Sequence, residues 1–248
     1  MNYLGLLLAA ILLVNSAQAK PAKVEHTEDM GELRKIRLAV DHVLDANHEF
    51  VARHSKRYFL PFIKGQTPKA TVLGCADSRV HTHAIDPHPD GDIFLVRNIG
   101  NQILPVRGSL EYGVRHLQTP LLLVLGHTMC GAVRAAMQSY SELSPAIKTE
   151  LDNLHVPQGD PDNAALVLDS VEHNINHQID EALNFFSEEL NQQKLIVIGA
   201  VYDFRNDYRQ GYGRLVIINV NGSTDTGKIK EVLGFSGKKS LNDVFTKK

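Results

Sequence analysis

Two short stretches decide the fold of this chain: LGCADSR at residues 73–79 and LGHTMCG at residues 125–131. Each follows an apolar run, residues 70–73 in the first case and 120–125 in the second. Each run gives way at a glycine, as a buried strand does before it enters a loop or helix. The second run is the most strongly apolar of the chain, which is typical of a central parallel strand covered on both faces.

Cys75, His127 and Cys130 follow these two strands. If the strands are parallel neighbours, the three side chains meet at the carboxyl ends, where open α/β sheets hold their ligands. Two thiolates and one imidazole suit Zn²⁺, and three protein ligands leave a fourth position for water or substrate. Arg79 can hold the Asp77 carboxylate through a two-pronged hydrogen bond. With Asp77 held, zinc keeps a water whose pKa falls from about 16 towards 7; with Asp77 on the metal, the site is silent.

The same two cysteines allow a second interpretation. They are the only cysteines of the chain, and an isolated pair in an exported protein is usually a disulfide. The polar residues around them favour metal, because a disulfide needs neither a histidine nor an Asp–Arg pair beside it. Both interpretations stay open at this point.

The rest of the chain alternates strands with helices, which predicts an α/β fold with a mainly parallel central sheet flanked by helices and an N-terminal helical arm. A polar segment at 20–31 predicts a loose arm ahead of one or two amphipathic helices at 32–58. The predicted strands are 70–75, 93–97, 121–125, 195–200 and 215–220, and the predicted helices are 109–117, 131–140 and 164–190.

The N-terminus predicts export. Residues 4–14 are almost purely apolar, and Ala17-Gln18-Ala19 has the small-x-small form of a signal peptidase site. We expect residues 1–19 to be a cleaved signal peptide and residues 20–248 to be one domain in the periplasm or outside the cell, without stable membrane association. Because no Lys or Arg precedes the apolar run, a retained membrane anchor is the alternative. A net charge of −2 without a basic run argues against nucleic acid as a partner.

The combination Cys75-x-Asp77-x-Arg79 with His127-x-x-Cys130-Gly131 resembles the β-class carbonic anhydrases, and the likeness extends to residues 97–101, 111–113 and 199–203. The resemblance implies one Zn²⁺ per subunit on Cys75, His127 and Cys130, together with the Asp77–Arg79 pair. It also implies reversible hydration of carbon dioxide to bicarbonate and a proton, by attack of zinc-bound hydroxide.

The resemblance extends to the substrate pocket and the assembly. Matched by motif offset, the pocket residues are Gln66, Phe94, Ile99, Tyr112 and the backbone amide of Gly131. In the family some of these side chains cross from a partner subunit, which implies a homodimer or homotetramer. Another branch of the family has a regulatory bicarbonate site that involves a tryptophan. This chain has no tryptophan and has Gln66 at the plant-like position, so it resembles the plant-like type with an open zinc position.

Two other functions remain in view. The same zinc site suits hydrolysis of a sulfur analogue such as carbon disulfide, and a zinc- or disulfide-stabilised binding module would need no turnover at all. Two thiolates make zinc a weaker acid than three imidazoles would, so we expect more hydration activity at alkaline pH. The pairs His81/His83 and His173/His177 have spacings that suit metal, and we interpret the second pair as solvent-facing.

Overall fold

The computed structural model describes residues 26–234, with side chains from residue 31 onwards. The signal peptide expected at residues 1–19 therefore lies outside the described residues. The described chain forms two compact units, which meet in sequence between Ile63 and Lys64.

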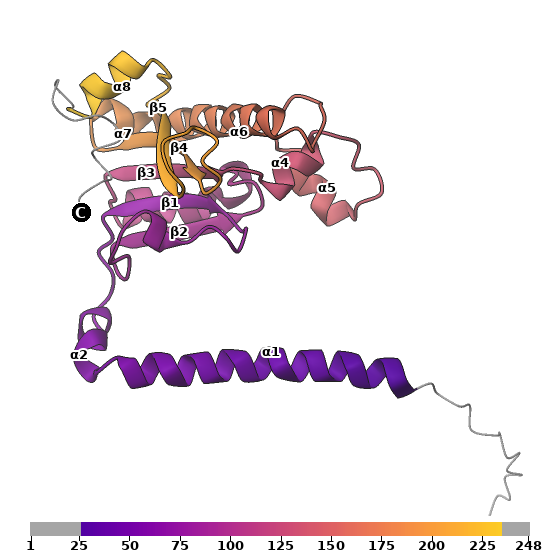
Figure 1. The fold of residues 1–248 in the computed structure, drawn as a ribbon. Helices are drawn as coiled ribbons and strands as arrows, with labels where there is room; N and C mark the ends of the chain where they lie inside the picture. Colours follow the sequence, from indigo (N-terminus) through magenta and orange to yellow (C-terminus); the bar gives the residue numbers. More distant parts are fainter. Residues whose placement is uncertain (1–25, 235–248) are drawn as a thin grey trace, which may run out of the picture. The chain divides into compact units, whose positions relative to one another are not determined.

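The larger unit is built on a five-stranded sheet in the order β2-β1-β3-β4-β5 (Figure 1). The strands are β1 Ala70–Cys75, β2 Ile93–Asn98, β3 Leu121–His127, β4 Ile196–Asp203 and β5 Arg214–Val220. β1 pairs in parallel with β2 and β3, and β3 pairs in parallel with β4, whereas β5 runs antiparallel beside β4. The predicted mainly parallel sheet with flanking helices is confirmed.

Helix α6, Ala164–Phe185, covers one face of the sheet and carries its apolar side chains into the core. Ile175, near its middle, is fully buried. A Cβ atom at Gly126 of β3 would lie 2.6 Å from Ile175, and one at Gly199 of β4 would lie 2.7 Å from it. The two glycines therefore allow the helix to approach the sheet more closely than any larger residue would permit.

The predicted helix boundaries need correction in three places. The helix expected at 109–117 begins earlier, as α3 Arg107–Glu111, and continues as the π-helix η4 Tyr112–His116, in which the Leu117 amide donates to the Tyr112 carbonyl at 2.9 Å. The helix expected at 131–140 ends early, as α4 Gly131–Ala136. The helix expected at 164–190 breaks at Phe186, whose backbone leaves the helical region while its ring is fully buried, and resumes as α7 Ser187–Asn191.

Shorter helices complete the larger unit. They are η2 Thr82–Ala84, η3 Leu104–Val106, α5 Pro145–Leu151 and α8 Thr226–Val232. α8 lies in the tail, for which the sequence made no prediction, and its buried Ile229 packs on the sheet face opposite α6 together with residues of β1, β3 and β4.

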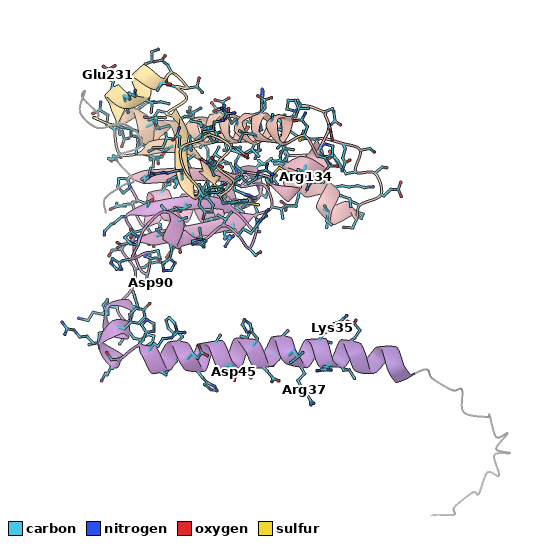
Figure 2. All side chains as sticks on the ribbon, in the orientation of Figure 1. Lys35, Arg37, Asp45, Asp90, Arg134 and Glu231 are labelled. Atoms are coloured by element: carbon cyan, nitrogen blue, oxygen red, sulfur yellow. The ribbon has the colours of Figure 1, made fainter. Side chains whose placement is uncertain are left out.

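The N-terminal unit is helical: α1 His26–Arg53, α2 Lys56–Phe59 and η1 Leu60–Phe62. The prediction of a loose arm through residue 31 is wrong, since α1 already begins at His26. Polar composition suggested the arm, but no proline between residues 22 and 60 stops a helix. Charged side chains such as Lys35, Arg37 and Asp45 project from α1 (Figure 2). Among the described helices, none is both long and apolar enough to cross a membrane.

Candidate metal centre

Cys75, His127 and Cys130 come together at one edge of the sheet. Cys75 ends β1, His127 ends the parallel neighbour β3, and Cys130 is the residue that precedes α4. Their ligand atoms all lie within 4.8 Å of one another, and at most 4% of any of the three residues is exposed. Both cysteines are free thiols with their Sγ atoms 3.9 Å apart, so the structure has no disulfide here.

A sharp turn aims His127 and Cys130 at the same point. Met129, which lies between them, has a left-handed backbone with φ 51°. That conformation costs a non-glycine residue roughly 1–2 kcal/mol, so the surrounding structure must stabilise it. The turn converts a spacing of three residues into convergence of two side chains.

The imidazole of His127 has one nitrogen occupied and one without a partner. Its Nδ1 lies 3.0 Å from the Thr128 carbonyl oxygen, to which it donates as N–H. Nε2 is fully buried and makes no hydrogen bond within the described part of the chain. Burying such a group unpaired costs about 1–3 kcal/mol. A metal ion that accepts the Nε2 lone pair and lone pairs of the two sulfurs removes that cost, so this donor set fits Zn²⁺.

Hydrogen bonds around Cys75 stabilise the negatively charged form of its sulfur. A hydrogen bond from Cys130 is the main reason why the pKa of Cys75 falls to about 4, and the Gly100 amide donates to Cys75 Sγ at 3.4 Å. The same hydrogen bond and burial raise the pKa of Cys130. The two sulfurs are therefore hydrogen-bonded to each other, with the pKa of Cys75 lowered and that of Cys130 raised. A thiol must lose its proton when it becomes a metal ligand, so metal binding here would release protons.

Asp77 and Arg79 form the expected two-pronged pair. Arg79 donates from Nε to Asp77 Oδ1 at 2.9 Å and from a terminal nitrogen to Oδ2 at 2.7 Å. These hydrogen bonds hold the pKa of the Asp77 carboxyl well below its usual range. Asp77 Oδ2 also lies 3.8 Å from His127 Nε2, which places the carboxylate beside the candidate metal position.

Two residues of the site had no role assigned from the sequence. Arg97 donates from Nε to the Cys75 carbonyl at 2.9 Å and from a terminal nitrogen to the Asp77 carbonyl at 2.6 Å, and so holds the loop after β1. Phe204 lies against Arg79 and His127. Arg97 is the first residue of the segment 97–101, to which the family resemblance extends, so the sequence did carry a signal for it. Nothing in the local sequence marks Phe204, because its partners are distant along the chain.

The predicted pocket residues are only partly brought together in one chain. The rings of Phe94 and Tyr112 lie 5.8 Å apart, and Tyr112 is 44% exposed. Ile99 packs in a separate apolar cluster with Leu151 and Leu154. Gln66 lies exposed in the loop before β1.

Gly131 opens α4 beside Cys130, and a Cβ atom added there would meet nothing within 4 Å.

The other histidines whose side chains the structure describes form no comparable centre. The rings of His81 and His83 are 6.4 Å apart, and His173 is exposed and lies 3.7 Å from Asp169. His177 is only partly exposed, unlike the solvent-facing residue predicted, and its ring lies against that of His155, with planes inclined by 32°. Within residues 31–234, Cys75, His127 and Cys130 are the only group of three or more potential ligands with metal-binding geometry.

Comparisons with known proteins agree with this geometry. The sequence profile of the carbonic anhydrase family matches residues 70–208. Carbonic anhydrase 2 of Mycobacterium tuberculosis is 48% identical over 79 residues, which are 32% of this chain and 38% of that protein, so the match spans well under half of that relative. Beta carbonic anhydrase 3 of Arabidopsis thaliana is 30% identical over 218 residues, 77% of this chain and 83% of that protein.

A solved structure shares the fold. A tetrameric β-carbonic anhydrase of the fungus Sordaria macrospora superposes with a TM-score of 0.61 at 22% identity, over 73% of this chain and 97% of that chain. The profile match contains both cysteines, the histidine and the Asp–Arg pair. The chain belongs to the carbonic anhydrase family, within its β class.

Proposed function

We propose that this chain is a zinc-dependent carbonic anhydrase that catalyses the reversible hydration of carbon dioxide to bicarbonate and a proton. The observation that carries the proposal is the buried, unpartnered Nε2 of His127, which faces two free thiols at the end of a parallel sheet. Family membership supports the same reaction.

Cys75, His127 and Cys130 would hold one Zn²⁺ per subunit and leave a fourth position open. Zinc bound in this way lowers the pKa of water and so supplies a nucleophile near neutral pH. The Gly100 amide compensates the charge on Cys75, and the Thr128 carbonyl fixes the ring of His127. Two anionic sulfurs lower the acidity that zinc confers, so we expect hydration to rise towards alkaline pH.

Asp77 and Arg79 govern what reaches the fourth position. While Arg79 holds the carboxylate, Asp77 accepts hydrogen bonds and does not compete as a ligand. The Gly131 amide is a substrate contact in this proposal, and the open space beside its Cα leaves room for a small molecule.

The substrate pocket is completed in the assembly of identical chains by four side chains, those of Phe94, Ile99, Tyr112 and Gln66. Carbon dioxide is small and apolar, which suits an aromatic and aliphatic wall, and an amide such as that of Gln66 suits bicarbonate oxygens. The exposed ring of Tyr112 beside Phe94 supports a pocket that is finished by a second copy of the chain.

The proposed assembly is a homodimer or homotetramer, as the Sordaria relative is tetrameric. Helix α1 supports this, since Ile36, Val40 and Val43 follow helical spacing and are each more than half exposed. We also propose that the chain is exported, on the strength of the apolar run at 4–14 and the small residues at 17–19.

Stopped-flow hydration of carbon dioxide with a pH indicator, together with metal analysis, tests the proposal. The mature protein should hold zinc and accelerate hydration. Cys130→Ser and His127→Gln should lose both properties, because each removes a ligand. His173→Gln, a histidine change on the exposed side of α6, should keep both. A wild-type protein that binds zinc but leaves the hydration rate unchanged would overturn the proposal.

A further inference from the structure

Phe204 enters the site from a rigid loop. It directly follows β4, where the buried carboxylate of Asp203 accepts hydrogen bonds from the backbone amides of Arg205, Asp207 and Tyr208 at 3.2, 3.0 and 2.9 Å. The Tyr208 hydroxyl also donates to Glu172 of α6. The loop is therefore anchored to the core on both sides of the point where the ring of Phe204 projects.

The ring of Phe204 contacts both His127, a proposed metal ligand, and the guanidinium of Arg79. The guanidinium carbon of Arg79 lies 4.7 Å from the ring centroid. The ring of His127 stacks on the same residue, with centroids 5.8 Å apart and planes inclined by 28°. Tyr202 supports it edge-on, with centroids 5.7 Å apart.

These contacts restrain Arg79 in a direction that its hydrogen bonds leave free. Asp77 holds the guanidinium in its own plane, and the Met129 carbonyl accepts a further hydrogen bond at 3.3 Å. The Arg79 side chain is nonetheless 51% exposed, and an exposed ion pair by itself is weakly ordered. An aromatic face beneath a guanidinium adds attraction perpendicular to that plane.

We propose that Phe204 is a positioning residue that keeps Arg79 on Asp77 and so keeps the Asp77 carboxylate away from the fourth ligand position. The role rests on the proposed zinc site, but the contact with Arg79 exists without metal. Because Asp77 Oδ2 is only 3.8 Å from His127 Nε2, a small reorientation of an unrestrained Asp77 would bring it to the metal.

The first test uses metal-free protein and hydrogen exchange of the Arg79 Nε–H, followed by ¹⁵N NMR. Phe204→Leu keeps apolar volume but removes the aromatic face, and we expect exchange to become about two- to fivefold faster, as an exposed cation–π contact predicts. Phe204→Tyr should restore the wild-type rate. Phe185→Leu is the matched control, because that ring lies under Arg107 and Arg115 instead.

The second test uses Co²⁺ in place of zinc and follows its visible absorption. Phe204→Leu should bind Co²⁺ with unchanged stoichiometry but show a changed ligand-field spectrum at neutral pH, as carboxylate replaces solvent. In an Asp77→Asn background, which lacks the carboxylate, Phe204→Leu should leave the Co²⁺ spectrum unchanged. The Phe185→Leu spectrum should match the wild type.

A graded substitution protects the test against misfolding. Fluorinated phenylalanines at position 204 keep the ring and its packing while weakening the negative face, so Arg79 exchange should accelerate in step with fluorination. Unchanged Arg79 exchange across this series, or an equal acceleration in Phe185→Leu, would overturn the inference. Neither readout depends on carbon dioxide hydration, so failure here is distinct from failure of the proposed enzyme.

Discussion

Among single residues, Asp77 shows most clearly how one neighbour sets the chemistry of a side chain. Hydrogen bonds from Arg79 lower its pKa, and folding therefore favours the ionised carboxylate. A carboxyl whose pKa falls on folding contributes stability that is fully present above the unfolded-state pKa of about 4. That stability is lost as the pH falls from there towards the lower folded-state pKa.

We expect Asp77→Asn to lower the free energy of unfolding of the chelator-treated protein by less than about 1 kcal/mol at pH 7, because Arg79 is half exposed. The difference from the wild type should shrink as the pH falls below about 4. Urea unfolding at several pH values measures it. Asp162→Asn, which removes the exposed partner of Arg134, is the control for a surface pair outside the site. A difference that grows on acidification would contradict the assigned cause.

The site residues that could be predicted from the sequence are those that lie close together along the chain. Cys75, Asp77 and Arg79 are two residues apart, and His127 and Cys130 are three apart, so local spacing exposes them as a set. Phe204 could not be predicted in this way. It contacts Arg79 only because β4 and the loop after it fold back beside the end of β3, a tertiary event without a local signature.

Helix α6 illustrates docking at the scale of elements. It lies close to the sheet because Ile175 fits over two glycines, and at Gly199 an added methyl group would also lie 3.2 Å from Ile179. Contacts this short force the side chains or the backbone to shift. The helix therefore depends on the absence of side chains at two sheet positions.

Gly199→Ala should lower the free energy of unfolding by about 1–3 kcal/mol, as overpacking does in a dense core. Ile175→Ala should cost about 2–5 kcal/mol by itself, and the double variant should cost less than the sum because the added methyl enters the vacated space. Denaturant unfolding of the four proteins gives the coupling. Gly159→Ala, whose methyl would meet only ordinary contacts at 3.6 Å, should change stability by under about 0.5 kcal/mol. Strict additivity would exclude the proposed contact.

The sequence predicts the strands better than the helix ends. Apolar runs bounded by turns located all five strands within a few residues, and the signal was clearest in β1, β3 and β4, which are buried on both faces. The π-helix at Tyr112 and the break at Phe186 were missed. The break at Phe186 coincides with a tertiary contact, since its ring is fully buried. Apolar periodicity alone does not encode such events.

At the scale of the whole molecule, α1 matters because the N-terminal unit by itself leaves an apolar stripe of this helix uncovered. Ile36, Val40 and Val43 lie along one side of the helix and are 60%, 52% and 66% exposed. An isolated helix stripe of this kind gains stability only by burial against another surface. The proposed assembly of identical chains would provide it.

Replacing Ile36, Val40 and Val43 together by Asp should dissociate the assembly towards the mass of a single chain, measured by light scattering during size-exclusion chromatography. Lys35→Asp with His42→Asp adds acid to the other side of α1 and should leave the assembled mass unchanged. Retention of the full assembled mass by the triple variant would show that this stripe is not the contact.

The parallel pairing of β1 with β3 also sets the order of events as the polypeptide folds. Cys75 and Cys130 are 55 residues apart, and the excursion through edge strand β2 lies between them. The three donor atoms converge only after that excursion has closed and the two central strands have joined. Capture of the proposed zinc ion would thus be a late step that requires the completed topology, and a chain whose sheet is mispaired would have no site to retain the ion.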